Sequence, residues 1–136
     1  MDIVFINTEI LFDNHDEVKL DTLININLLK YHSKCKFVLT DETNLSFDKL
    51  LDKLRSHGLP LQPIDIIPQV DAEKGHKINI WLQNNKYDNF VIIDSISNYN
   101  SIKNWYNNIV IIDNKKGITD KKRKISLIFL NKRDTK

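Results

Sequence analysis

Residues 3–10 have the sequence IVFINTEI, in which four consecutive apolar residues are followed by the polar residues Asn7, Thr8 and Glu9. A short apolar run that is rich in Ile and Val and has no polar face is typical of a strand buried on both sides. Such strands lie in parallel sheets, where ligands bind at the carboxyl ends of the strands. The stretch therefore predicts an α/β fold and a candidate site that begins at Asn7.

Further apolar runs of strand length follow the first one, at residues 36–40, 64–67, 90–94 and 108–113. Stretches with helical periodicity alternate with them, at residues 16–33, 46–60, 72–85 and 119–132. Alternating strands and helices with right-handed crossovers form a sheet that is mostly parallel and covered by helices. We therefore predict a three-layer α/β/α sandwich around a parallel sheet of about five strands.

The apolar positions of each periodic stretch predict which face of the helix is buried. The expected buried residues are Leu20, Leu23, Ile24, Leu28 and Tyr31 in the first helix, Phe47, Leu50, Leu51 and Leu54 in the second, Ile78, Trp81 and Leu82 in the third, and Ile125, Ile128 and Phe129 in the fourth. Ser46 and Thr119 stand where N-caps of the second and fourth helices are expected.

The composition limits the class of protein. The 136 residues are enough for one domain with a hydrophobic core, so we expect a single domain over residues 1–136. No apolar run approaches the roughly 20 residues that a membrane span needs. Cys35 is the single cysteine, which excludes an internal disulfide and favours the reducing cytoplasm. The three glycines form neither of the common Gly-rich phosphate-binding loops.

Charge is unevenly distributed along the chain. The net charge is +2, yet residues 115–136 carry nine Lys or Arg against Asp120 and Asp134, so the remaining residues are net acidic. The basic C-terminal helix and tail, at about residues 119–136, suit contact with nucleic acid or with an acidic partner. A solvated helix face explains the same pattern, and no aromatic residues are interleaved as stacking platforms. We therefore favour the solvated face over nucleic-acid contact.

Polar and acidic side chains collect at the predicted carboxyl ends of the strands, where the ligand crevice of a parallel sheet lies. They are Asn7, Glu9, Asp13, Thr40, Asp41, Glu42, Asp94, Ser95, Ser97 and Asp113. This rim is strongly acidic, and it predicts contact with a cation or with a basic protein surface.

The order of these motifs resembles the haloacid dehalogenase (HAD) superfamily, and in particular the small, cap-poor HAD domains of bacterial and viral RNA-repair polyproteins. The stretches that carry the resemblance, besides the first strand, are KGHKI at 74–78, IIDS at 92–95 and IVIIDNKKGITDKK at 109–122. Each motif is short, and their order and spacing carry the likeness over residues 2–131. The resemblance implies a HAD-like sheet with strand order 5-4-1-2-3 and no sizeable cap.

The resemblance also implies roles for five positions. Asn7 stands at the position of the nucleophilic Asp and Glu9 at that of the general acid/base. Thr40 matches the motif II hydroxyl, and Lys74 matches the motif III base, which Lys77 would replace if its helix began later. Asp94 matches the motif IV ligand of magnesium, which residue 7 would share.

The departures from the family pattern affect the nucleophile, the magnesium ligands and the binding of phosphate. An amide oxygen is a very poor nucleophile toward a phosphate ester, so Asn7 removes the covalent step. It also removes a ligand charge, which leaves at most a weak magnesium site at Asp94 and Asn7. Glu9 is one methylene longer than the expected Asp. Asp41 and Glu42, beside Thr40, are expected to repel a phosphate.

We therefore expect a catalytically degenerate HAD-like domain that acts as a binding module and neutralises or regulates a partner protein. The expected contact surface is the acidic rim of Glu9, Asp13, Asp41, Glu42 and Asp94. The alternative is a magnesium-dependent phosphatase or phosphotransferase with altered chemistry, in which Glu9 or Asp94 activates a water molecule.

Overall fold

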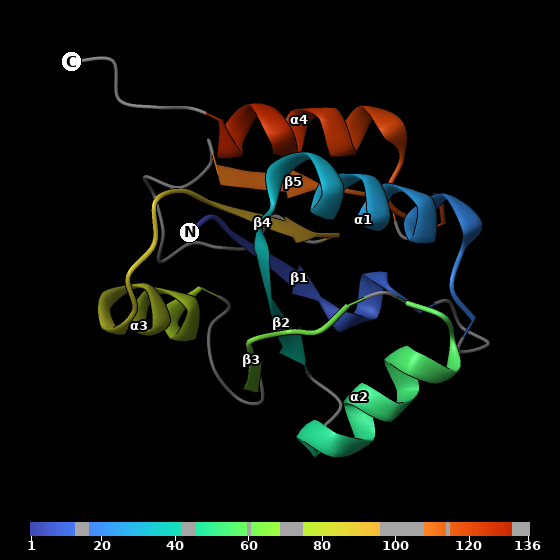
Figure 1. Ribbon diagram of the computed structural model, residues 1–136, viewed down its shortest axis with the longest axis horizontal. Coiled ribbons are helices and arrows are strands. Elements are labelled where there is room, and N and C mark those ends of the chain that lie inside the picture. The colour runs from blue at the N-terminus through green and yellow to red at the C-terminus, as the bar shows by residue number, and fades with distance from the viewer. Residues whose placement is uncertain are drawn as a thin grey trace.

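Figure 1 shows the computed structural model, in which helices cover a central sheet. The structure describes residues 1–12, 17–41, 46–59, 61–68, 75–95, 108–113 and 115–131 of the chain. In this part of the chain, no helix has both the length and the apolar character needed to cross a membrane.

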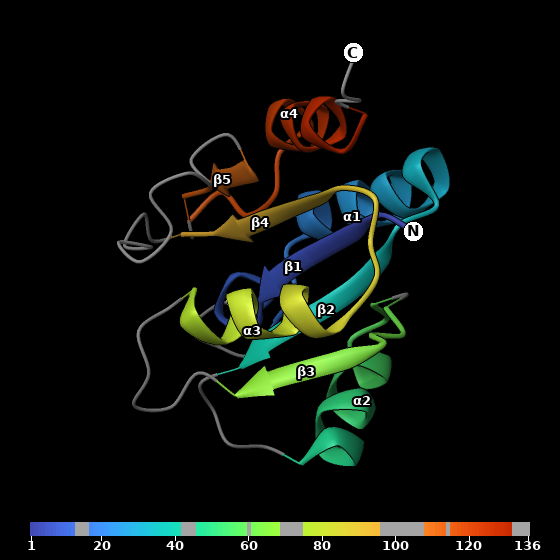
Figure 2. The ribbon, with the colours of Figure 1, turned by 90° about the vertical axis from the view of Figure 1, so that its left-hand side faces the viewer.

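The sheet consists of five parallel strands. They are β1 (Ile3–Asn7), β2 (Lys36–Asp41), β3 (Asp65–Pro68), β4 (Phe90–Asp94) and β5 (Ile109–Ile111). Their order is β3-β2-β1-β4-β5, and every neighbouring pair is parallel. Figure 2 shows all the arrows pointing the same way. The expected order 5-4-1-2-3 is the same order counted from the other edge, so the predicted sheet is confirmed.

Helices follow the strands as the periodicity predicted. They are α1 (Leu20–Ser33), α2 (Phe47–Ser56), α3 (His76–Asn84) and α4 (Asp120–Leu130), with a short 3-10 turn, η1 (Thr8–Ile10), directly after β1. The predicted N-caps are confirmed, because Ser46 Oγ accepts from Lys49 N and Thr119 Oγ1 accepts from Lys122 N, both at 3.3 Å.

The two faces of the sheet bury different helices. On one face, Val4 and Ile6 of β1 belong to a core cluster with residues of α1, α2 and α4. On the other face, Ile3 and Phe5 pack with Ile78, Trp81 and Leu82 of α3, and Figure 2 shows α3 in front of the sheet and α1 behind it. The predicted buried face of α3 is thus confirmed. Strand β1 is buried on both sides, as its continuous apolar run indicated.

The predicted buried face of α1 is wrong for three of its five residues, although Leu23 packs against the core. Leu20 and Tyr31 are 69% and 79% exposed, and Ile24 is also exposed. The buried residues of this helix are Thr22, Asn25, Ile26 and Leu29. In α4, Ile125 and Phe129 pack against the core as predicted, but Ile128 is 64% exposed. In α2, Leu50 and Leu54 are buried as expected, but Phe47 is exposed.

Polar contacts of Thr22 and Asn25 set the orientation of α1. Thr22 Oγ1 accepts from the backbone N–H of Ile118 at 3.1 Å, and Asn25 Nδ2 donates to the Ile118 carbonyl at 2.9 Å. These bonds satisfy buried backbone groups just before α4, which would be costly to leave unpaired. Gly117 allows the close approach, since its φ is +70° and a Cβ there would collide with Thr22 Oγ1.

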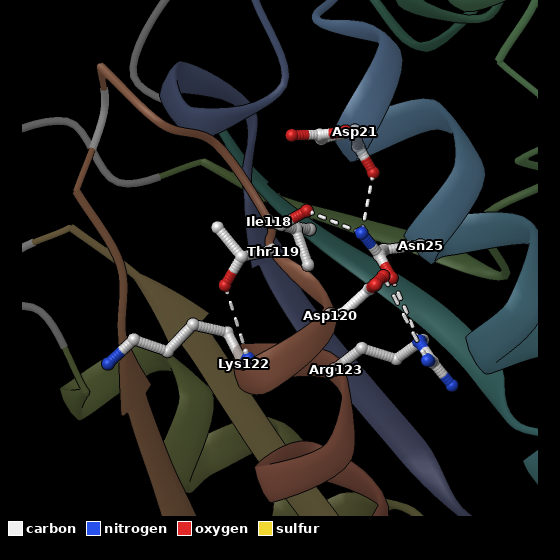
Figure 3. A network of polar contacts seen from close by, with 7 residues as sticks. All are labelled: Asp21, Asn25, Ile118, Thr119, Asp120, Lys122 and Arg123. Atoms are coloured by element: carbon white, nitrogen blue, oxygen red, sulfur yellow. Dashed lines mark hydrogen bonds and ion pairs between the residues drawn. The ribbon is translucent and has the colours of Figure 1, made fainter.

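Asn25 joins α1 to α4 as well as to the preceding turn. Figure 3 shows its amide nitrogen between the carbonyls of Asp21 and Ile118. Its Oδ1 accepts a hydrogen bond from Arg123 Nε, and the two atoms are 2.8 Å apart. Asn25 therefore satisfies a carbonyl at one end and a guanidinium at the other. Substitution by an apolar residue would leave both of them without this partner.

We predict that Asn25→Leu lowers the free energy of unfolding by about 2–4 kcal/mol, because it keeps the side-chain volume and removes three hydrogen bonds from a buried position. The measurement is urea denaturation followed by circular dichroism. Asn27→Leu is the matched control, since it makes the same change on an exposed position of the same helix. Equal losses of stability in the two variants would contradict the anchoring role of Asn25.

Candidate functional site

Strand register brings three of the predicted site residues into one row. Asn7 is the Cα partner of Thr40 on β2. Ile6 is the partner of Ile93 on β4, so the next position along both strands places Asn7 beside Asp94. The three side chains thus lie on adjacent strands at the carboxyl edge of the sheet, which is where the sequence predicted a site.

The same three side chains also share a face of the sheet. Side chains alternate along a strand, so Asn7 follows Phe5, Thr40 follows Val38 and Asp94 follows Ile92 on one side. Phe5, Val38 and Ile92 all belong to the cluster that packs against α3. Asn7, Thr40 and Asp94 are buried, and Asp94 is fully so. The row therefore lies on the face of the sheet that packs against α3.

The side-chain amide of Asn7 lies between a backbone donor and a carboxylate. Its Oδ1 accepts from the Glu9 N–H at 3.0 Å, which caps η1. Its Nδ2 donates to both carboxylate oxygens of Asp94, at 3.3 Å to Oδ1 and 3.2 Å to Oδ2. The position of the family nucleophile thus presents N–H donors toward Asp94.

Asp94 is held from several directions. Its Oδ1 also accepts from the Ser95 N–H at 2.7 Å, and its carbonyl accepts from Ile112 N at 2.9 Å just beyond β5. The carboxylate is therefore surrounded by donors from β1 and from its own strand end. The backbone bond ties the site to the segment that leads into α4.

Asp41 lies on the opposite face of β2 from Thr40, because neighbouring side chains of a strand alternate. It accepts a hydrogen bond from Thr8 Oγ1 at 2.8 Å, and both side chains are buried. Asp41 therefore does not lie beside Thr40 on the same face, as the sequence had led us to expect. Burial also removes Asp41 and Asp94 from the surface that we expected to meet a partner.

The remaining predicted site residues are exposed or undescribed. Glu9 is exposed in η1, so its side chain remains at the surface beside the row. Asp13, Glu42 and Lys74 lie outside the described residues. Lys77, the alternative to Lys74, is held elsewhere, since its Nζ donates to the Pro68 carbonyl at the end of β3 at 2.6 Å.

The donors around Asp94 do not suit a magnesium ion. Magnesium requires oxygen ligands in octahedral geometry, whereas residue 7 turns its NH2 group toward the carboxylate. In the described part of the chain, no group of three or more His, Cys, Asp or Glu side chains could hold a metal ion. Among the described residues, the side chains of this row therefore do not fit the cation that the HAD resemblance implies.

Cys35 offers no substitute nucleophile. Its side chain is buried at the start of β2, and burial raises the pKa of the thiol above its ordinary value. A raised pKa lowers the fraction of the reactive thiolate at neutral pH. Its place at the amino end of the strand also separates it from the row of Asn7, Thr40 and Asp94.

A family model described as the HAD domain in Swiss Army Knife RNA repair proteins matches residues 5–122. The chain belongs to this family. The match runs from within β1 to the first turn of α4, so it includes Asn7, Thr40 and Asp94. No curated protein and no solved structure matched the chain.

Two features of this HAD domain were missed in the sequence. The hydrogen bond from Thr8 to Asp41 joins the end of β1 to the end of β2. The signal in the sequence was that side chains alternate between the two faces along β2, which turns Asp41 away from Thr40. The direct bond between Asn7 and Asp94 depends on the register of β1 against β4. An Asn and an Asp at equivalent ends of adjacent strands were a signal for that bond.

Proposed function

We propose that this HAD domain is catalytically degenerate and acts as a binding module. The observation that supports the proposal best is the bond from Asn7 Nδ2 to both oxygens of Asp94. In an active member of the superfamily, a carboxylate at position 7 would attack phosphorus and form an aspartyl phosphate. An amide that donates to its neighbour carries no anionic oxygen for that attack.

The alternative function is phosphatase or phosphotransferase chemistry in which Asp94 or Glu9 activates water. A general base must reach the water whose proton it takes. Asp94 is fully buried, and donors already occupy its oxygens, which disfavours it as a base. The alternative therefore rests on Glu9, the exposed carboxylate beside the row.

A partner protein that this module neutralises or regulates would meet the carboxyl edge of the sheet. Within the described part of the rim, Glu9 and Asp113 are the carboxylates that remain exposed. A basic protein surface that contacts this edge would therefore pair with Glu9 rather than with Asp41 or Asp94. Asp13 and Glu42 belong to the same proposed contact, although they lie outside the described residues.

Lysines beside this edge favour a nucleic acid as a second kind of partner. Two depressions of about 410 Å³ each flank Lys116 and Thr119. One is also lined by Lys115, and the other by Lys121 and Lys122. Among the described residues, none of these four lysines has an ion-pair partner. We name Lys115, Lys116, Lys121 and Lys122 the lysine surface.

The stability of α4 does not account for the lysine surface. Lys121 and Lys122 lie in the first turn of α4, where the helix dipole disfavours positive charge. A bound anion would offset this repulsion, and a phosphodiester backbone supplies regularly spaced anions. The matched family is described from RNA repair proteins, so RNA is the nucleic acid that we propose for this surface.

We predict that the unmodified protein does not hydrolyse p-nitrophenyl phosphate in the presence of magnesium, because position 7 lacks a nucleophile. The assay is release of p-nitrophenol by purified protein beside Asn7→Asp, Glu9→Gln and Asp94→Asn variants. Activity in Asn7→Asp alone would show that the geometry survives and only the nucleophile is missing. Turnover by the unmodified protein that disappears in Glu9→Gln or Asp94→Asn would instead establish the phosphatase alternative.

We predict that Lys121→Glu/Lys122→Glu weakens binding of a fluorescein-labelled single-stranded RNA at least about tenfold, because two contacts between lysine and phosphate are lost. The salt dependence of binding should decrease as well, since fewer counterions are released. The measurement is fluorescence anisotropy at several salt concentrations. Lys36→Glu/Lys86→Glu is the control, because it makes the same charge change at exposed positions near the amino ends of β2 and β4. Equal weakening in both variants, or no binding by the unmodified protein, would contradict the RNA contact.

A further inference from the structure

The amide of Asn7 and the carboxylate of Asp94 form a closed pair on neighbouring strands. The amide nitrogen lies 3.2 and 3.3 Å from the two carboxylate oxygens. We infer, on the basis of the function proposed above, that this amide takes the place of the divalent cation and makes the site independent of metal. The domain would then keep the same folded site whether or not magnesium is present.

A fully buried carboxylate needs compensation for the water that it has lost. Asp94 receives this compensation from the Nδ2 group of Asn7 and from the Ser95 N–H at 2.7 Å. All of these donors are neutral and belong to the chain itself. Hydrogen bonds to a charged group are among the stronger ones, so they can stabilise the carboxylate without a cation.

The orientation of the Asn7 amide is fixed from both ends. Its Oδ1 accepts from the Glu9 N–H, and its Nδ2 faces the Asp94 oxygens. A cation would require Oδ1 to turn toward Asp94. That rotation would remove the bond from Glu9 N to Oδ1 and bring the Nδ2 donor against the Glu9 N–H donor. Asn7 therefore excludes a cation by geometry as well as by its lack of charge.

An Asp at position 7 would reverse this arrangement. It would keep the shape of the side chain and the bond from Glu9 N, but it would place two carboxylates about as close as Asn7 and Asp94 are now. Like charges that are this close repel each other strongly inside a protein, and a divalent cation between them removes the repulsion. Asn7→Asp should therefore make folding stability depend on a cation.

The test compares thermal unfolding of three proteins in EDTA and in magnesium chloride. The unmodified protein should show the same melting temperature in both. Asn7→Asp should melt about 5–10 °C lower in EDTA and recover most of that loss in magnesium. Asn7→Asp/Asp94→Asn exchanges the two groups, so its melting temperature should be close to that of the unmodified protein and should not respond to magnesium.

Three results would overturn the inference. One is a magnesium-dependent rise in the melting temperature of the unmodified protein that equals the rise in Asn7→Asp. Another is an Asn7→Asp protein that is as stable as the unmodified one in EDTA. The third is an exchange variant that melts as low as Asn7→Asp or, where that single variant does not fold, well below the unmodified protein. None of these measurements depends on phosphatase activity. The p-nitrophenyl phosphate assay can therefore contradict the proposed function while the melting temperatures still support the inference.

Discussion

The register of β1 between β2 and β4 is the constraint on which the site depends. Strand β1 lies in the middle of the sheet and pairs with both neighbours, so a shift of one residue would turn Asn7 to the opposite face and break its alignment with Thr40 and Asp94. That register places Asn7 between Thr40 and Asp94 on the α3 face. The hydrogen bonds between Asn7 and Asp94 then follow from the position of their strands.

Much of the fold was predictable from the spacing of apolar residues and from the order of the motifs along the chain. Continuous apolar runs indicated buried strands, and the HAD resemblance supplied the strand order that the structure confirms. The buried side of a helix was less predictable where buried polar contacts determine its orientation. Helix α1 turns Thr22 and Asn25 inward, where they bind the backbone of Ile118, and Leu20, Ile24 and Tyr31 remain exposed. Hydrophobic periodicity carries no information about such long-range polar partners.

The site and the surface around it have opposite electrical characters. The buried row contains a carboxylate that is satisfied by neutral donors, with no anionic nucleophile beside it. The segment after β5 carries the lysine surface, and it is linked to the row through the bond from Ile112 N to the Asp94 carbonyl. Under the proposed function, this HAD domain retains its fold and binds partners through neighbouring surfaces.

The central claim is that the Asn7 amide, and no cation, satisfies Asp94. NMR of the Asn7 side-chain amide tests it most directly, with the resonances assigned by comparison with Asn7→Asp. We predict slowly exchanging NH2 signals that neither shift with magnesium nor broaden at low concentrations of paramagnetic manganese, because no ion binds beside them. Selective broadening of the Asn7 signals by manganese, removed in the Asp94→Asn variant, would place a cation at the site and contradict the account.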